Sequence, residues 1–387
     1  MNHILVTHHD AELYGADKSL IRTLRGLRSC DLKPIVALPL YGPLVDVLRA
    51  DGMEVHIGPV GKLSRQLMKP LAVPRVACDM LASIRFLTRI IAGRRVVLAY
   101  ANSVATLGGA VWALVHRVPR LWHVREIVVA PRVATHAFPW VLQLIGGWCV
   151  CNSHATRNWI VHHRPMLDGN SSVIWNGLER LVPPSPEAVA AFRCKLGVLP
   201  GETLVTLVGR INRWKGQGLL IEAAALIRSR GVRGVRYLMV GDVADGQTHF
   251  REAMLAQIQA AGLGAEVLWH GFMPEVDVAW AASDIAVVPS TEPEPFGRVA
   301  IEAMAYGLPV IAAAHGGLVE IVEPGKTGVL VKPGSVEELA GAIIRLVQEP
   351  GLRRSLGDAG RVRQAAVFSQ EEHDHKLVGL IKQLAQQ

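Results

Sequence analysis

The sequence of 387 residues lacks the features that mark several other classes of protein. It has no C-x-x-C pair, and its five cysteines are an odd number, so we expect neither a disulfide framework nor a zinc site. The longest mostly apolar stretches, residues 104–115 and 138–151, fall short of the ~20 residues of a membrane span. A secretory leader is not expected, because only the short apolar run 4–6 follows the first three residues. We therefore expect a cytoplasmic protein with reduced thiols.

Aromatic residues are also scarce, at 5% of the chain, and they do not alternate with basic residues. No nucleic-acid recognition motif occurs, so a nucleic-acid partner is not expected. Hydrophobic residues, in contrast, make up 50% of the chain, and the mean hydropathy is +0.27. A chain of this length and composition can bury two sizeable cores, which predicts two folded domains.

The net charge of +8 is concentrated in the amino-terminal half. Residues 1–180 hold 21 Lys+Arg against 11 Asp+Glu, whereas residues 181–387 hold 20 against 22. Much of the excess lies in residues 62–95, where basic and apolar side chains alternate. Such a stretch is typical of a surface that contacts an anionic membrane, although a solvated face of ordinary helices has the same composition.

Short apolar runs alternate with segments of helical length along the whole chain, which predicts parallel sheets covered by helices. The twelve expected strands are residues 4–7, 35–38, 96–100, 121–124, 148–151, 173–175, 204–208, 236–240, 267–270, 285–288, 310–313 and 328–331.

Six strands in each half indicate an α/β fold of two doubly wound, Rossmann-like domains. The proline-rich segment 181–186 separates domain 1–180 from domain 181–367, and a helix follows in residues 368–387. Ligands of such sheets bind beyond the carboxyl ends of the strands, so we expect the chemistry in a cleft that the two domains face.

A basic loop follows the strand predicted at residues 204–208. Gly209 permits close approach of the backbone to a ligand. Arg210 supplies a planar guanidinium with several hydrogen-bond donors, and Lys215 supplies a compact ammonium. Together these two cations suit a diphosphate, although basic loops after strands are often only solvated.

Residues 292–309 form a stronger pattern, in which two glutamates flank the expected start of a helix. Glu294 lies on a proline-rich loop with Phe296, and Gly297 lies where the helix begins. Glu302 falls in the second turn of this helix, and Gly307 is expected to end it. Amides at the helix start can bind phosphate, and the carboxylates can accept hydrogen bonds from hydroxyl groups. The alternative for Glu302 is an ion pair with an arginine of the same domain.

Two nucleotide motifs are excluded. The run Gly325-Lys326-Thr327 is not a P-loop, because position 320 is Glu320 where that motif requires glycine. A dinucleotide-dependent dehydrogenase would carry G-x-G-x-x-G after an early strand, and this pattern is absent. The pair Gly316 and Gly317 instead follows the strand at residues 310–313 and permits another close backbone approach.

In combination these residues resemble the family-4 retaining glycosyltransferases of the GT-B fold. The family's Gly-Arg…Lys-Gly loop, Glu-x7-Glu motif and Gly-Gly-x-x-Glu turn are matched by Arg210 and Lys215, by Glu294 and Glu302, and by Gly316, Gly317 and Glu320. Residues 173–177 and 15–20 are further matches, and the resemblance covers essentially the whole chain. Position 14 is Tyr14 where many relatives have a second glycine.

The resemblance implies transfer of a sugar from a nucleotide diphosphate to an acceptor hydroxyl, with retention of configuration. It implies that Arg210 and Lys215 bind the diphosphate, Glu302 the ribose and Glu294 the transferred sugar, with Phe296, Gly297 and Gly15 also on the donor side. The implied catalytic set is His123, Glu294, Arg210 and Lys215. The amino-terminal domain would bind the acceptor, and the terminal helix would cross back onto it.

No D-x-D motif occurs, so we expect metal-independent turnover, with Arg210 and Lys215 neutralising the leaving group. We expect no cofactor, because the UDP- or GDP-sugar is a substrate. A covalent intermediate on Glu294 and a front-face ion pair both remain open, and we favour the second. We expect a saccharide or lipid-linked saccharide as acceptor, in envelope or exopolysaccharide synthesis, at the inner membrane face. The alternative is a non-catalytic scaffold in a polysaccharide assembly complex.

Overall fold

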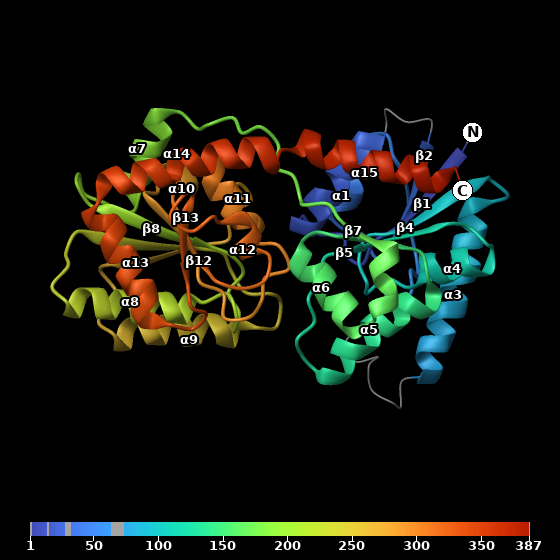
Figure 1. Cartoon of the computed structure of the whole chain (residues 1–387), viewed down its shortest axis with the longest axis horizontal. Coiled ribbons are helices and arrows are strands. Elements are labelled where there is room, and N and C mark those ends of the chain that lie inside the picture. The colour runs from blue at the N-terminus through green and yellow to red at the C-terminus, as the bar shows by residue number, and fades with distance from the viewer. Residues whose placement is uncertain (1, 14, 28–31, 63–72, 387) are drawn as a thin grey trace. The chain divides into compact units, whose positions relative to one another are not determined.

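The structure, a computed structural model, describes residues 2–13, 15–27, 32–62 and 73–386. The chain forms two compact units, of which Figure 1 shows the first in blue to green together with the red carboxy-terminal helix, and the second in green to red. Unit 1 comprises Met1–Gly177 and Gln370–Gln387, and unit 2 comprises Leu178–Ser369. The chain therefore passes between the units twice, after Gly177 and again after Ser369.

Unit 1 contains a seven-stranded parallel sheet in the order β3-β2-β1-β4-β5-β6-β7. Its strands are β1 (Asn2–Thr7), β2 (Leu32–Leu38), β3 (Glu54–Ile57), β4 (Val96–Ala101), β5 (Arg120–Val124), β6 (Trp148–Cys151) and β7 (Ser171–Val173). The expectation of six strands was wrong here, because it missed β3. This strand has four residues that alternate polar and apolar side chains at the sheet edge, so it contains no apolar run.

The helices of unit 1 cover both faces of this sheet. They are α1 (Gly15–Leu27), α2 (Pro43–Ala50), α3 (Val73–Ile91), α4 (Gly108–Val115), α5 (Arg132–Ile145), α6 (His154–His163), the 3₁₀ helix η3 (Pro165–Asn170) and α15 (Gln370–Ala385). The last of these, α15, lies beside α1 in Figure 1 although it closes the chain. Its Leu377 and Ile381 are fully buried in the same apolar cluster as Leu20 and Leu24 of α1.

Unit 2 contains a six-stranded parallel sheet in the order β10-β9-β8-β11-β12-β13, and all six of its strands were predicted from apolar runs. The strands are β8 (Thr203–Val208), β9 (Val235–Val240), β10 (Val267–Gly271), β11 (Ile285–Val288), β12 (Val310–Ala313) and β13 (Gly328–Val331). The helices are α7 (Pro186–Lys195), α8 (Gln217–Ser229), α9 (Thr248–Ala260), α10 (Asp277–Ala282), α11 (Arg298–Ala305), α12 (Leu318–Ile321), α13 (Val336–Gln348) and α14 (Pro350–Val367).

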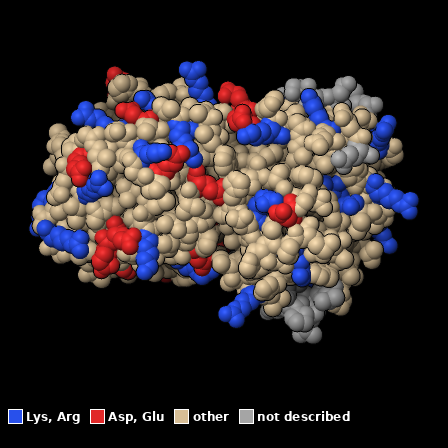
Figure 2. Space-filling view, in the orientation of Figure 1, with Lys and Arg blue, Asp and Glu red and all other residues tan. Residues whose placement is uncertain are grey.

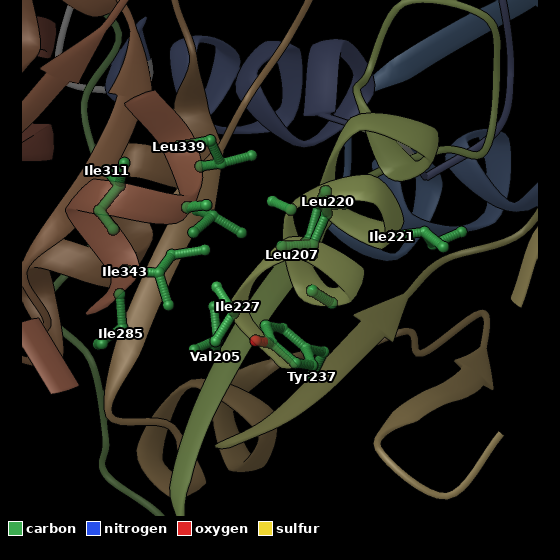
Figure 3. Packing of buried hydrophobic residues seen from close by; sticks show 14 of the residues in the cluster. Val205, Leu207, Leu220, Ile221, Ile227, Tyr237, Ile285, Ile311, Leu339 and Ile343 are labelled. Atoms are coloured by element: carbon green, nitrogen blue, oxygen red, sulfur yellow. The ribbon is translucent and has the colours of Figure 1, made fainter. Parts of the chain in front are cut away.

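The largest apolar core of unit 2 lies between its sheet and the helices α8 and α13 (Figure 3). Val205 of β8 and Ile311 of β12 are fully buried there, together with Leu220 of α8 and Ile343 of α13. Burial of one such side chain contributes about 1.5–3 kcal/mol to stability. All residues of β11 and β12 are buried, as expected for central parallel strands with helices on both faces.

The strand orders determine where each sheet can bind a ligand. In both sheets the order reverses beside the first strand, β1 in unit 1 and β8 in unit 2. At this point the loops that follow two neighbouring strands run to opposite faces of the sheet. A crevice therefore forms beyond the carboxyl ends of these two strands. In unit 2 this edge carries the loops that follow β8, β11 and β12. Among the residues described, no helix combines the length and apolar composition needed to cross a membrane.

Candidate functional site

Three loops of unit 2 bring the sequence-predicted donor residues together. The loops span residues 209–216, 289–297 and 314–317, and they follow the adjacent strands β8, β11 and β12 at the same edge of the sheet. Arg210 and Lys215 lie on the first loop, Glu294 on the second, and Gly316 and Gly317 on the third.

The central contact of this site is a buried ion pair between the first and second loops. Nζ of Lys215 donates to Oε1 of Glu294 at 2.7 Å, although 79 residues separate the two in sequence. The hydroxyl of Ser290 donates to the same oxygen at 2.6 Å. The Glu294 side chain is only 5% exposed and that of Lys215 18% exposed, so both charges are largely removed from water. Removal of either partner would leave the other charge buried and unpaired, which destabilises the folded protein.

The loop 209–216 is held by hydrogen bonds to its own backbone. Oδ1 of Asn212 accepts from the amides of Trp214 and Lys215 at 3.1 and 2.9 Å. Gly216 has a φ of +86°, and a Cβ atom there would lie 2.3 Å from the carbonyl oxygen of Pro289. Only glycine fits this position, because the start of α8 approaches the end of β11 so closely. These contacts direct Lys215 towards Glu294, while the Arg210 side chain is exposed.

The third loop supports Glu294 from the other side. A Cβ atom on Gly316, whose φ is +61°, would lie 2.3 Å from the carbonyl oxygen of Glu294. The amide of Gly317 donates to that same oxygen at 2.8 Å, and Nε2 of His315 donates to the carbonyl oxygen of Ser290 at 2.9 Å. Burial lowers the pKa of His315. The close approach predicted for these glycines is thus an approach to the Glu294 loop.

The helix α11 begins and ends where the sequence predicted. Gly297 is its N-cap residue with a φ of +100°, and Gly307 follows its C-cap with a φ of +71°. Glu302 lies in the second turn, and its Oε1 accepts from Nε of Arg298 at 2.7 Å. The alternative considered for Glu302, an arginine partner, therefore occurs within the helix itself. The predicted contact of Glu302 with ribose stays a prediction.

Phe296 is buried rather than presented at the surface. Its side chain is 2% exposed, and its ring packs edge-on against Phe368 with the ring centroids 5.9 Å apart. A Cβ atom on Gly297 would lie 2.4 Å from Leu318. Any contact of these two residues with a donor would therefore involve their backbone, and it stays a prediction.

In unit 1, the predicted catalytic residue His123 is the penultimate residue of β5, and its fully buried side chain belongs to a polar network. Its Nδ1 accepts from Nη2 of Arg125 at 3.1 Å and lies 2.6 Å from the hydroxyl of Tyr100. An arginine can only donate, so the ring proton resides on Nε2. Burial, with the charge of Arg125, lowers the pKa of His123 well below its ordinary value, and the ring is neutral. Its Nε2 has no hydrogen-bond partner within the described part of the chain.

The network continues from His123 to the ends of two neighbouring strands. Nε of Arg125 donates to Oδ1 of Asn102 at 3.2 Å, and Nη1 donates to Oδ1 of Asn176 at 3.1 Å. Asn102 in turn contacts Nδ1 of His8, whose Nε2 lies 2.7 Å from Oδ1 of Asp17. His8, Asn102 and Arg125 follow β1, β4 and β5, and Asp17 lies in the first turn of α1, so these residues lie at the crevice of this sheet, whereas Asn176 follows the edge strand β7. Gly15 is the first residue of α1, and its predicted role in donor binding is not tested.

Both sites contain residues that the sequence motifs do not mark. Ser290 and Asn212 were not predicted, and neither were Tyr100, Asn102 and Arg125. All but Tyr100 lie on the loops that directly follow a strand. A polar residue at this position in the sequence is therefore a candidate for a ligand site. Among the residues described, no group of three or more His, Cys, Asp or Glu side chains is placed to hold a metal ion.

Comparison with known protein families gives one match, for residues 190–363, to the family described as glycosyl transferases group 1. A D-inositol 3-phosphate glycosyltransferase of Rhodococcus jostii (strain RHA1) is 38% identical over 240 residues, which cover 60% of this chain and 51% of the relative. The corresponding protein of Segniliparus rotundus is 39% identical over 188 residues, 48% of this chain and 41% of its own length. The chain thus spans about half the length of these relatives.

Solved structures are similar over nearly the whole chain. Anabaena Alr3699/HepE in complex with UDP-glucose has a TM-score of 0.84 and 26% sequence identity, covering 98% of this chain and 99% of its own. The lipopolysaccharide outer core galactosyltransferase WaaB has a TM-score of 0.73 at 14% identity, with 99% of both chains covered, and supports the fold alone. The resemblance and the fold class stated from the sequence are confirmed. The cleft between the two domains stays a prediction.

Proposed function

Because residues 190–363 match the glycosyl transferases group 1 family, we propose that this chain transfers a sugar from a nucleotide diphosphate donor to an acceptor hydroxyl. The observation that carries the proposal is the buried Lys215–Glu294 pair at the crevice of unit 2, with Arg210 on the same loop as Lys215. A cation beside a carboxylate at this edge suits a substrate that carries both phosphate and hydroxyl groups. The similarity to a protein crystallised with UDP-glucose supports a UDP-sugar as donor.

In this proposal donor binding exchanges the partners of Lys215. The ammonium turns from Glu294 to the diphosphate, where it neutralises the departing charge together with Arg210. Oε1 of Glu294 is then available to accept a hydroxyl hydrogen of the transferred sugar. Its negative charge also stabilises the positive charge that develops at the anomeric carbon as the bond to phosphate breaks.

The acceptor side of the reaction is assigned to unit 1. The neutral His123 can donate from Nε2, its ring atom without a hydrogen bond in the described structure, to a sugar or acceptor hydroxyl. With its pKa far below neutrality, His123 orients and polarises a hydroxyl but does not carry a charge. The acceptor proton then passes to the leaving phosphate oxygen, and configuration is retained through a front-face ion pair. Arg125 and Tyr100 hold the imidazole ring in the required tautomer.

We further propose that the acceptor is a saccharide linked to lipid, at an anionic membrane surface in envelope or exopolysaccharide synthesis. The excess of basic residues in the first 180 residues supports this choice, because anionic lipid attracts such a surface. The related D-inositol 3-phosphate glycosyltransferases suggest a second acceptor class, a phosphorylated polyol.

The proposed function is tested by donor binding followed by turnover. We expect UDP and UDP-glucose to raise the unfolding temperature, because a ligand present at about 100 times its Kd stabilises a protein by about 2.7 kcal/mol. Release of UDP from the donor should persist in excess chelator, since two fixed cations replace the metal. Binding without any turnover would favour the scaffold alternative, and the absence of both would refute the proposal.

Replacement of Glu302 by alanine should weaken donor binding without unfolding the protein. Loss of the hydrogen bonds that a carboxylate accepts from ribose hydroxyls costs about 1.5–3 kcal/mol, a rise in Kd of about 10- to 100-fold, measurable by calorimetry with UDP. The matched control is Glu349→Ala, which breaks another i,i+4 pair, with Arg345, away from the site. Equal UDP affinity in Glu302→Ala and Glu349→Ala would remove Glu302 from the ribose site.

A further inference from the structure

The helix α5 of unit 1 has an apolar face that no described part of the chain covers. Val133, Trp140 and Leu144 are 73%, 49% and 64% exposed. Their spacing of seven and four residues places them along one side of the helix. We name these three residues the α5 stripe. The inner side of the helix, with Phe138 and Leu142, is buried in the core, so the stripe is additional to the packing that holds α5 in place.

The surface around the stripe is apolar as well. Val129 just before α5 is 46% exposed, and Met166 of η3 is 74% exposed. Met166 lies beside the stripe, because Nε2 of Gln143 in α5 is 3.3 Å from its sulfur atom. Contiguous exposed apolar patches of this kind are unusual on monomeric proteins and mark surfaces that contact a partner or a membrane.

The charge of this region indicates the kind of partner. The sequence has no Asp or Glu between Glu126 and Asp168, and this segment contains Arg132, Arg157 and Arg164. Arg157 pairs with Asp168, whereas Arg132 is exposed at the start of α5. Figure 2 shows a largely uncharged surface on the displayed face over α5 and α6. An apolar stripe with a tryptophan and cationic neighbours, on a helix that has no acidic residue, matches the interfacial region of an anionic bilayer, and the acidic residue near Met166, Asp168, is paired with Arg157.

The basic stretch predicted to contact a membrane has a different character. Residues 63–72 of this stretch lie outside the described residues. In its described part, α3 presents Arg75, Arg85 and Arg89 to solvent, but Leu81 is the one large apolar side chain found exposed there. That stretch can therefore contribute attraction to anionic lipid, while α5 contributes the apolar surface that enters it.

The place of α5 in the fold connects this surface to the proposed reaction. The segment that leads from β5 into α5 starts at the carboxyl edge of the sheet, where His123 and Arg125 lie. Val129 and Val133 are therefore near the edge at which we propose that unit 1 receives its acceptor. A lipid-linked acceptor would reach this edge directly from a membrane on which the stripe rests.

We propose that the α5 stripe, with Val129 and Met166, docks unit 1 on an anionic phospholipid bilayer. The helix lies along the membrane surface, its three apolar side chains enter the interfacial layer, and Arg132 remains among the lipid phosphates. The inference deepens the proposed function, since it names the surface through which a lipid-linked acceptor is reached.

The test is flotation of the full chain with vesicles of phosphatidylcholine alone or of an equal mixture with phosphatidylglycerol. We expect binding to the mixed vesicles that falls at high salt. The variant Val133→Ser/Leu144→Ser should bind at least about tenfold more weakly, because two exposed apolar side chains no longer enter the membrane. The matched control is Val362→Ser/Val182→Ser, which removes two exposed valines of unit 2 that are 70% and 87% exposed.

Equal binding by the stripe variant and the control variant, or no binding of the wild-type chain to mixed vesicles, would overturn the proposal. So would a stripe-dependent dimer in sedimentation velocity combined with unchanged vesicle binding, which would identify a second copy as the occupant. Unfolding temperature checks that both variants fold. UDP-sugar binding is measured separately on the same proteins. Absence of vesicle binding by the wild-type chain, or equal vesicle binding by the stripe and control variants, refutes this inference, and intact donor binding in that case leaves the proposed function standing.

Discussion

Replacing Lys215 by alanine is expected to lower kcat by about 10²–10³-fold, the usual cost of removing one preorganised group that stabilises developing charge. The ammonium is the group that we propose moves onto the leaving diphosphate, and the described structure already holds it beside the site, 2.7 Å from Glu294. UDP release from the donor at saturating concentration measures the effect. Lys215→Arg should recover only part of the rate, because the guanidinium has a different shape and hydration.

The control for this change is Lys326→Ala. Lys326 is also a unit 2 lysine near a glutamate, but it is 76% exposed and lies 3.7 Å from Glu323. A surface pair of this kind contributes about 0–1 kcal/mol, so rate and stability should stay close to those of the wild type. If Lys215→Ala kept the kcat of Lys326→Ala, the cation would have no part in catalysis.

Replacing Glu294 by glutamine is expected to lower kcat by about 10²-fold, the cost of losing one preorganised charge, while UDP binds as tightly as before or more tightly. The amide keeps the size of the side chain but removes the charge that stabilises the anomeric carbon. It also releases Lys215 from its ion pair, so the exchange onto diphosphate no longer breaks a buried salt bridge. Calorimetry with UDP and single-turnover kinetics separate these two effects.

The second loop also supplies the control for Glu294. Glu292, two residues earlier, pairs with Arg213 of the first loop at 2.6 Å, but the Arg213 side chain is 58% exposed. Glu292→Gln thus breaks an ion pair between the same two loops, but one that is more exposed to solvent. Both kcat and UDP affinity should therefore be nearly unchanged. A fall in UDP affinity for Glu294→Gln, parallel to a fall in unfolding temperature, would show that the residue only holds the loops together.

The opposed outcomes for Lys215 and Glu294 follow from one geometric fact, the sharing of a single carboxylate oxygen by Lys215 and Ser290. Without donor, this arrangement satisfies both charges in a site that water hardly reaches. In the proposed function, donor binding replaces it with an equally complete set of partners. We therefore expect the site to select a ligand that supplies an anion to Lys215 and a hydroxyl to Glu294 simultaneously.

Apolar runs in the sequence were sufficient to predict all six strands of unit 2, because parallel strands with helices on both faces are apolar along their whole length. The same reasoning missed β3, where only Val55 is buried in a four-residue edge strand. The glycines at the ends of α11 were predicted for a similar local reason, since a positive φ is a property of the residue itself and its immediate neighbours.

The candidate residues of the donor site could be named from sequence, but not their partners. Arg210, Lys215, Glu294 and Glu302 were recognised from the spacing of short motifs. The arginine partner of Glu302 was left open, and it is four residues away in the same helix. Ser290 was not predicted, because a serine after a strand has no distinctive pattern.

The sequence by itself determined where most of the strands lie and which polar residues occupy the loops after them. Strands and the loops that follow them can be recognised from local composition and local backbone preference. Only the tertiary structure decided that Lys215 meets Glu294 and that His123 is a buried, neutral ring with Arg125 and Tyr100 at Nδ1. The physical reason is that strand order joins loops from distant parts of the chain, while burial sets the charge state of what they carry.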